Sequence, residues 1–581
     1  MNTLEPRLVC VESVADLPVL WAVVQRLDLT ALLDRHFPTP LHWKGPLTPS
    51  EVLAVWLLFI LSESDHCLNH LEPWVAQHQH TISALLDKPI RPTDFHDDRL
   101  ADWLNRLAAD GVWAAFEREL NQHTIRVYQL PTHTVRIDTT TANSYADVLS
   151  EQGLLQFGHS KDDPHRPQIK VAAAILDPLG MPLVTAVVAG NTADDPLYIP
   201  AIRAVRESLG KGGRTYVGDC KMAALNTRAF VASGGDFYLC PLSQLQLSAA
   251  KRRELLKPLW DGTQALESVY RPGKQEQAEE ELVAQGFFVD VPLTASVDDA
   301  DSSWVERRWL VRSQTYAIAQ AQSLDRRLTK VEAALRELPT RKQGKKRLSE
   351  AELSKTATAL LKREGLQDLM NFTLTAATTT ATKRGYGKRA KKEETTVELS
   401  IAVERNETAI AERKRELGWQ VYGTNGLEMK LSQVVWAYRG QYRIENDWSR
   451  LKGKSLSLTP MYLQDEERIQ GLVYLLSLAL RMLTLVEWVV REKLEQSGKK
   501  LRDLYDGQPG RQTARPSAEL LLKAMKTISV SVVEVNGQTY ALLSPLTEIQ
   551  KELLALWDMP PDSYEKIRRK FREPSPSMSE P

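Results

Sequence analysis

Two aspartates lie in strand-like segments at positions where acidic side chains can do chemistry. Asp138 interrupts the segment IDTTT, where an apolar residue would be the default. Asp219 ends the segment YVGD, at the carboxyl end of a strand, where α/β proteins present ligands and reactive groups. Because acids are common at strand ends, neither position identifies a site by itself.

A third acid lies much later, in the helical segment AYRGQYRIENDWSRLKGK. Tyr438 precedes Glu445 by seven residues and Lys452 follows it by seven. At about 3.6 residues per turn, this spacing places an aromatic ring, an acid and a base on one face of a single helix. A surface helix with ordinary ion pairs is the alternative. The long apolar segment that follows favours a half-buried helix.

Three carboxylates are a suitable ligand set for hard divalent ions, since Mg²⁺ prefers oxygen ligands. Two such ions about 4 Å apart activate a water or a 3′-hydroxyl and neutralise the leaving oxygen of a phosphodiester. Zinc hydrolases would instead need histidine or cysteine ligands. The residue types therefore point to metal-dependent chemistry at phosphorus.

The composition is that of an ordinary globular protein. The chain has 581 residues, 43% of them apolar and 25% charged, so two to four domains are expected. Its 74 basic and 74 acidic residues cancel, which excludes a uniformly basic protein but not local basic grooves. The four cysteines form no CxxC pair, which favours a reducing cytoplasm over a disulfide framework or a cysteine-based zinc site.

Targeting and membrane signals are weak. The N-terminus lacks the layout of a signal peptide. The most apolar run, Leu472 to Val490, contains Arg481 and Glu487, each costly at a bilayer centre. We therefore predict a buried helix and no membrane association.

The order of elements indicates an α/β core. Residues 1–125 have helical patterns throughout. Strands are predicted next, with a hairpin turn at Asp177–Gly180, in the order three strands, helix, strand, helix, strand. This alternation predicts a mixed sheet with helices. The predicted segments are 134–145, 169–177, 182–191, 196–210, 214–220, 222–235 and 236–242.

The segment after Pro241 is less regular. Residues 243 to about 430 mix helices with strand-like pieces and contain two basic runs, at 341–347 and 383–392. Such runs are solvated loops or nucleic-acid contacts, and the sequence leaves both open. A late hairpin is predicted to turn at Asn536-Gly537.

These segments resemble the RNase H-like DDE transposases. More narrowly, the chain is similar to bacterial insertion-sequence transposases with a Tyr-x2-Arg-x3-Glu-x6-Lys signature and a β-rich insertion before the signature helix. The resemblance covers about residues 1–560. It is carried by RIDTTT, SKDDPHRPQIKVAAAILDPLGMPLVTAVVAGNTAD, YVGDCKM and YRGQYRIENDWSRLKGKSLSLTPMYL.

The resemblance implies roles for individual residues. Asp138, Asp219 and Glu445 become the catalytic, metal-binding triad, holding two Mg²⁺ ions for which Mn²⁺ can substitute. The signature arginine is replaced by Gln441, which puts the role of that arginine in doubt. Trp448 is expected either to stack on a flipped base or to pack in the core. The expected DNA-binding residues are Tyr438, Arg443, Trp448, Lys452 and Lys454.

The resemblance also implies an architecture. We expect an α/β, RNase H-like mixed sheet interrupted by an α+β insertion, with a helical N-terminal domain and a helical C-terminal region. The expected parts are a helical domain at 1–128 (a candidate for DNA binding), the first part of the core at 129–242, the insertion at 243–430, the second part of the core at 431–500 and a C-terminal region at 501–581.

The expected activity is cleavage at the ends of an insertion sequence, followed by transfer of the 3′-OH into target DNA. The partners would be double-stranded DNA, as terminal inverted repeats and target, and a second copy of the chain on that DNA, in the bacterial cytoplasm. Two alternatives stay open. One is a catalytically silent, transposase-derived DNA-binding protein, and the other is an RNase H-like nuclease that does not join strands.

Two smaller groups of residues have weaker signals. His66, His70, His78 and His80 form a local cluster that suggests either a metal site or ordinary surface histidines. Asn191 and Asp194, in the loop GNTAD, are expected to shape a turn.

Overall fold

The structure is a computed structural model that describes residues 7–41, 43–109, 111–160, 162–271, 281–297, 299–340, 348–383, 392–536 and 538–571. The chain forms two compact units, which we describe separately. Unit 1 comprises Met1–Cys240, Pro292–Trp304 and Trp436–Pro581, and unit 2 comprises Pro241–Val291 and Val305–Val435.

Unit 1 begins with a strand and continues as a group of helices. The strand, β1 (Arg7–Ser13), shows that the prediction of helices throughout residues 1–125 is wrong at its start. The reason is tertiary, because β1 pairs with β13 (Ser529–Val535) from the other end of the chain. The helices are α1 (Leu17–Arg26), α2 (Leu29–His36), α3 (Pro49–Glu63), α4 (Leu68–Gln77), α5 (Gln79–Leu86), α6 (Asp97–Leu107) and α7 (Val112–Tyr128).

The central sheet of unit 1 follows the predicted order of elements. Its strands are β2 (Thr134–Asn143), β3 (Gln168–Asp177), β4 (Met181–Ala189), β5 (Thr215–Val217) and β6 (Phe237–Pro241). They lie side by side in the order β4-β3-β2-β5-β6. β2, β3 and β4 are antiparallel neighbours, whereas β5 is parallel to β2 and β6 is parallel to β5. The α/β class with a mixed sheet is confirmed, and this order and these directions are those of an RNase H-like sheet.

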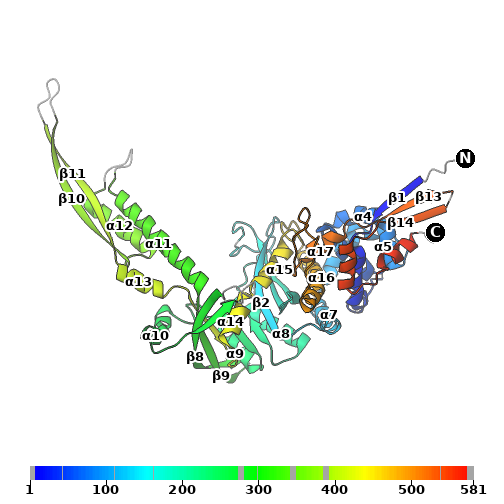
Figure 1. Cartoon of the computed structure of the whole chain (residues 1–581), viewed down its shortest axis with the longest axis horizontal. Helices are drawn as coiled ribbons and strands as arrows, with labels where there is room; N and C mark the ends of the chain where they lie inside the picture. The colour runs from blue at the N-terminus through cyan, green and yellow to red at the C-terminus, as the bar shows by residue number, and fades with distance from the viewer. Residues whose placement is uncertain are drawn as a thin grey trace. The chain divides into compact units, whose positions relative to one another are not determined.

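Helices α8 (Tyr198–Leu209) and α9 (Leu225–Ser233) connect the later strands. The core helix is α16 (Glu466–Ser497), which is labelled in Figure 1. It contacts α6, β4 and α3 within unit 1. By length and composition α16 is the one helix of the described residues that could cross a membrane, but 94% of its apolar window is buried inside the protein. The prediction of a buried helix is therefore confirmed.

The segment that carries Glu445 forms two helices, so the prediction of one continuous helix is wrong. α14 (Leu431–Arg439) ends before Gly440, and α15 (Tyr442–Lys452) begins after Gln441. A Cβ at position 440 would lie 2.3 Å from Nη2 of Arg136, so glycine at this position lets the arginine reach the backbone. Tyr438 therefore belongs to α14, and Glu445 and Lys452 belong to α15.

The C-terminal region returns to the first strand. β13 forms the predicted hairpin with β14 (Gln538–Leu543), and Asn536 in its turn has a φ of 56°. The three-stranded sheet has the order β1-β13-β14. The helices of this region are α17 (Ala518–Met525), α18 (Glu548–Leu556) and α19 (Ser563–Lys570).

Unit 2 contains strands that neighbour one another in the order β12-β9-β8-β7, with α10 (Ala249–Trp260) packed through Leu256 into their apolar cluster. The strands are β7 (Glu267–Arg271), β8 (Glu281–Val297), β9 (Ala300–Ser313) and β12 (Trp419–Thr424). The tips of β8 and β9 belong to unit 1. Unit 2 thus differs from the expected insertion at 243–430 in two ways. It lacks residues 292–304, and it extends from Pro241 to Val435.

A second part of unit 2 is a long two-stranded ribbon beside a helical pair (Figure 1). One apolar cluster joins the base of the ribbon to the helices. The basic run 341–347 lies outside the described residues, as does the run 383–392 apart from its two end residues. The elements are α11 (Gln314–Glu337), α12 (Glu350–Glu364), β10 (Met370–Lys383), β11 (Lys392–Arg405) and α13 (Glu407–Arg415).

Candidate active site

The first two acids of the expected triad occupy matching positions on parallel strands of unit 1. Asp138 is in β2, and Asp219 is two residues beyond the end of β5. Arg136 of β2 pairs with Val217 of β5. Asp138 is two residues after Arg136, and Asp219 is two residues after Val217. Because parallel strands present their carboxyl ends at one edge, both carboxylates belong to the same edge of the sheet.

Helix α15 brings Glu445 toward this edge. Glu445 is exposed and lies in the first turn of α15. Trp448, on the same helix, donates its Nε1–H to Oδ2 of Asp138 over 3.2 Å. Residues three apart are neighbours on a helix surface. The hydrogen bond from Trp448 to Asp138 therefore holds the side of α15 that carries Glu445 next to β2.

Two tyrosines lie among the three acids. Burial raises the pKa of Tyr438 to about 12, and the carboxylates of Asp219 and Glu445 add to the effect. Burial also raises the pKa of the Tyr198 phenol well above its usual value, helped by Asp219 and then by Asp138. Since charges shift a pKa mainly at short range, Tyr438 lies near Asp219 and Glu445, and Tyr198 lies near Asp219 and Asp138.

The spacing of the acids is wider than the ligand shell of one ion. Within the described part of the chain, the groups of three possible ligands whose donor atoms all lie within 4.8 Å of one another are found elsewhere. Two Mg²⁺ ions about 4 Å apart, each about 2.1 Å from its oxygens, allow outer ligands up to about 8 Å apart. The all-oxygen donors fit hard divalent ions, and a pair of ions accepts ligands spread more widely than one ion does.

Asp219 is oriented by neutral donors. The Tyr198 hydroxyl donates to Oδ1 of Asp219 over 2.6 Å, and the backbone N–H of Lys221 donates to the same oxygen over 2.8 Å. Because the raised pKa keeps the phenol protonated, Tyr198 acts as a fixed donor at neutral pH. Sequence reasoning missed Tyr198, whose position in an amphipathic helix gave no sign of this contact.

A fourth acid lies beside the triad. Asp194 accepts hydrogen bonds at Oδ1 from the Thr139 hydroxyl over 2.9 Å and from Nζ of Lys170 over 2.7 Å. Burial opposes ionisation of Asp194, but these two donors outweigh it and lower its pKa. Thr139 follows Asp138 directly in β2. Asp194 thus links the loop after β4 to the strand that carries Asp138, a larger role than the expected turn.

Arg443 has a different place from the one expected for a DNA contact. Its Nη1 lies 2.5 Å from Oδ1 of Asp177, the last residue of β3. The fully buried Arg136 lies 2.9 Å from the other oxygen of Asp177 and also donates to the carbonyl of Ala437. The group therefore anchors the break between α14 and α15 to the sheet. Gln441 has a buried side-chain oxygen with no hydrogen-bond partner among the described residues.

The other expected DNA contacts differ in accessibility. Trp448 is only 7% exposed, which corresponds to the packed alternative rather than to an aromatic ring free to stack on a base. Lys452 lies 3.1 Å from Oδ2 of Asp162, with its side chain 23% exposed. Lys454 is exposed. Of the lysines, Lys454 is therefore the more accessible to DNA phosphate.

The far side of α15 is held by partly buried ion pairs. Arg450 donates to Glu487 of α16 and lies 3.0 Å from Oε1 of Glu519 in α17. Arg491 also pairs with Glu487. Burial disfavours the charge on Arg450, but the two acids outweigh it and raise its pKa. These contacts fix the orientation of the helix that carries Glu445.

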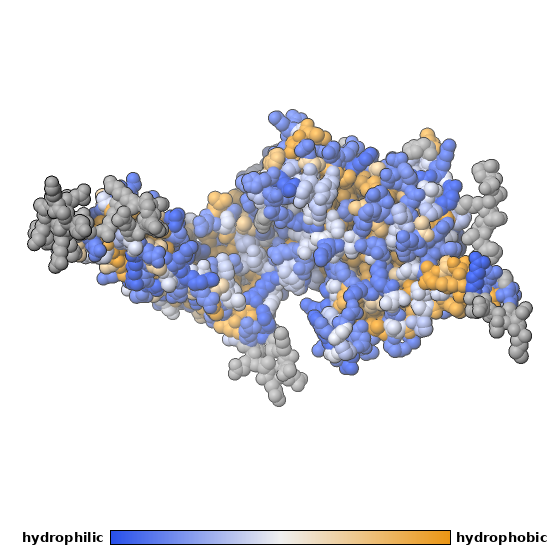
Figure 2. Space-filling view, turned by 90° about the horizontal axis from the view of Figure 1, so that it is seen from above, coloured by the Kyte–Doolittle hydropathy of each residue, from blue (hydrophilic) through white to orange (hydrophobic). Residues whose placement is uncertain are grey.

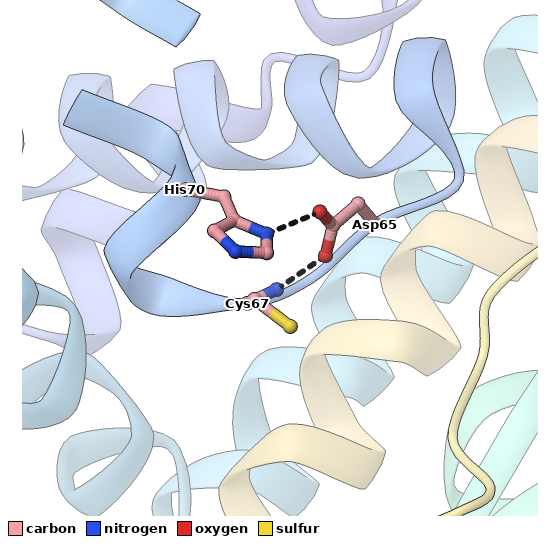
Figure 3. Close-up of side chains that lie close together, drawn as sticks. All are labelled: Asp65, Cys67 and His70. Carbon is pink, nitrogen blue, oxygen red and sulfur yellow. Dashed lines mark hydrogen bonds and ion pairs between the residues drawn. The ribbon is translucent and has the colours of Figure 1, made fainter. Parts of the chain in front are cut away.

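The histidine cluster does not form one site. His80 lies 2.9 Å from Glu12, and His78 stacks on Trp74. His70 accompanies Asp65 and Cys67 in a group of potential metal ligands (Figure 3).

That group is explained by the start of α4. Nδ1 of His70 lies 2.6 Å from Asp65, and the backbone N–H of Cys67 donates to the same carboxylate over 2.8 Å (Figure 3). Burial and Asp65 raise the pKa of the Cys67 thiol to about 11, which keeps it from acting as a thiolate ligand at neutral pH. The contacts are those of a local turn that precedes α4, in which an aspartate side chain accepts the backbone N–H two residues later.

The comparison with protein families decides the assignment of the chain. The family described as "Transposase DDE domain" matches residues 133–482. The chain belongs to this transposase family. The match includes Asp138, Asp219 and Glu445 together with the whole of unit 2. No curated protein matches the chain.

Among solved structures, this transposase is similar to one described as the piggyBac transposase synaptic complex with hairpin DNA. The two chains are 9% identical, with a TM-score of 0.35, and the match covers 97% of this chain and 86% of the other.

Proposed function

We propose that this transposase cleaves DNA at the ends of an insertion sequence and joins the freed 3′-OH to target DNA, with Asp138, Asp219 and Glu445 holding the required metal ions. One observation carries the proposal. The parallel register of β2 and β5 puts two acids at one edge of the sheet, and the Trp448–Asp138 hydrogen bond sets the helix of the third acid against that edge.

The donor set suits two Mg²⁺ ions, with Mn²⁺ as a substitute. When bound, the ions lower the pKa of an attacking water or hydroxyl and neutralise the leaving oxygen. The chain's own residues keep the ligands in place. Tyr198 fixes one oxygen of Asp219, and Trp448 fixes one oxygen of Asp138. The exposed Glu445 is left to turn its carboxylate toward the same site.

The proposed reaction has two displacements at phosphorus. In the first, the oxygen of water forms a bond to phosphorus, and the bond to the 3′-oxygen of the element end breaks, leaving a 3′-OH and a 5′-phosphate. In the second, this 3′-oxygen forms a bond to a target phosphorus, and a target 3′-OH leaves. Each attacking oxygen loses one proton and each leaving oxygen gains one, so no other reactant is needed.

The partners follow from this chemistry. The substrates are double-stranded DNA with terminal inverted repeats and a target duplex. Two ends must be joined coordinately, so two copies of the chain act together. Tyr438, Lys452 and Lys454 are proposed to contact the DNA near the cleaved strand. The proposed setting is the cytoplasm of a bacterium, on the nucleoid.

A plasmid carrying the gene with its natural flanking DNA tests the proposal. We expect the wild-type protein with Mg²⁺ to nick the flanks and to join a pre-cut end to a second plasmid. Glu445→Gln should lose both activities while still retarding the flanking DNA in a gel. Glu151→Gln, which changes an exposed acid elsewhere in unit 1, is the matched control.

The outcomes separate the alternatives. Cleavage retained by Glu445→Gln would contradict the assignment of the triad. Cleavage without joining would indicate a nuclease, and DNA binding without cleavage by the wild-type protein would indicate a silent relative.

A further inference from the structure

The three-stranded sheet β1-β13-β14 has one covered face and one open face. On the covered face, Val530 and Ala541 are 0% exposed and Val532 is 6% exposed. This face is closed by α19 and α5, which contact β14 and β1. Glu12 also holds the start of α5, because its carboxylate accepts the backbone N–H of Thr81.

The open face is apolar. Two rows of side chains cross the three strands on this face. One row is Leu8, Val533 and Tyr540, and the other is Val11, Ser531 and Leu542. Apolar side chains on this face and on the adjoining edge are strongly exposed: Leu8 59%, Val9 55%, Val11 58%, Tyr540 39% and Leu542 54%. In Figure 2, hydrophobic residues gather at the end of unit 1 that carries these strands in Figure 1. A contiguous exposed apolar patch of this kind marks an interaction surface.

The two rows of this face carry no charged residue. Every member is aliphatic, a serine or a tyrosine. DNA phosphates need Lys and Arg, so a nucleic acid is a poor occupant. The terminal segments of the chain are poor occupants as well. Residues 1–6 and 572–581, MNTLEP and REPSPSMSEP, are mostly polar, charged or proline.

An uncharged face is electrostatically complementary to itself. A two-fold interface brings the same patch of two copies together, so any charge near its centre would meet its own kind. Here no such repulsion arises. The free edge of β1 is less suited to the contact, because the register shifts between Leu8 and Cys10, and bulges at an edge oppose strand pairing.

We propose that this open face packs against the same face of a second copy, and that the two sheets stack as a sandwich across a two-fold axis. Leu8, Val11, Tyr540 and Leu542 of both copies form its centre. Facing sheets pack about 10 Å apart, which suits interdigitated side chains of this size. The proposal gives a surface to the pairing of copies that joining two DNA ends requires, but it does not depend on the metal chemistry.

Sedimentation velocity of the full chain, without DNA or divalent metal, tests the proposal. We expect a dimer for the wild type and monomers for Val11→Lys/Leu542→Lys and for Val11→Glu/Leu542→Glu. Each double change should raise the dimer dissociation constant on the order of 100-fold. An equimolar mixture of the two variants should form a heterodimer, because opposite charges then face each other.

Controls keep the test decisive. Leu41→Lys/Leu149→Lys adds the same charge at positions 107% and 72% exposed elsewhere in unit 1 and should stay dimeric. Circular dichroism shows whether the lysine variants are folded. If they are not, the milder change Leu542→Ser replaces them in the test and should also weaken the dimer. A monomeric wild type at the highest soluble concentration, or dimers that persist in folded charged variants, would overturn the proposal. Asp219→Asn should dimerise normally, which separates this result from the proposed catalysis.

Discussion

Around the edge of β2 and β5, Asp219 accepts hydrogen bonds from a phenol and a backbone N–H, and Asp138 accepts one from an indole. On the far side of α15, Glu487 and Glu519 are instead neutralised by arginine. Neutral donors orient a carboxylate without cancelling its charge, so it keeps its affinity for a cation. Arginine pairs use that charge to hold the helix. Carboxylates thus have the proposed catalytic role on one side of α15 and hold the helix in place on the other.

The largest expected effect is on the catalytic side. Asp219→Asn should lower the rate of plasmid cleavage by at least about 10³-fold, because the stabilisation that a metal gives the transition state is worth several kcal/mol. The thermal midpoint should stay within a degree or two, which a scanning calorimeter measures. A comparable loss of stability would mean that Asp219 serves assembly rather than catalysis.

A change among the ion pairs on the far side of α15 should instead lower the stability of the protein. Arg450→Met leaves Glu487 and Glu519 without their shared partner and should cost about 3 kcal/mol of unfolding free energy in urea. Arg363→Met, which removes an exposed pair with Glu364, is the control and should cost less than about 1 kcal/mol. Equal effects of the two substitutions would contradict the role given to the buried cluster.

Tyr198→Phe should affect metal affinity rather than the limiting rate. Loss of the hydroxyl that fixes Asp219 should raise the Mg²⁺ concentration at half-maximal cleavage about 10- to 100-fold, as removal of an outer partner of a metal ligand generally does. The rate should recover at saturating Mg²⁺. Tyr216→Phe, in β5, should leave the Mg²⁺ titration unchanged. A lower rate that excess metal does not restore would argue against orientation as the role of Tyr198.

The effect that is smallest per unit changed, a slope with pH, concerns a carboxyl that neither side uses. Burial raises the pKa of Glu117 to about 8, although Arg481 opposes the shift. Because the folded-state pKa is above the unfolded value, this group's contribution to stability is present below about pH 4.5 and is lost as the pH rises toward 8. The slope should be at most about 1.4 kcal/mol per pH unit. Denaturation of Glu117→Gln at several pH values should show this slope removed.

Local sequence signals were sufficient for the central sheet. The alternating apolar segments and the Asp177–Gly180 turn predicted the strands and the order of elements along the chain, and Asp219 was expected at the carboxyl end of its strand. These signals act over a few residues, so one sequence reveals them. The catalytic acids themselves stay predictions that the geometry supports.

The contacts between distant segments were not predictable. β1 pairs with β13 from the other end of the chain, and Arg136 approaches Gly440 at the break between α14 and α15. Arg443 looked like a DNA contact because its acid partner, Asp177, is 266 residues away. The same holds for Tyr198 and Asp194, whose sequence neighbours give no sign of the groups they bind in the folded chain.

The pairing of β1 with β13 has a consequence during protein synthesis. Val11 cannot pair with Ser531 until the ribosome has added the 520 residues that separate them (531 − 11). At about 5–20 residues per second, a ribosome needs about half a minute to two minutes to make the partner strand. Until then β1 stays an unpaired apolar segment that chaperones and proteases can recognise. A truncated polypeptide keeps that segment exposed, so closure of this sheet distinguishes finished chains from prematurely terminated ones.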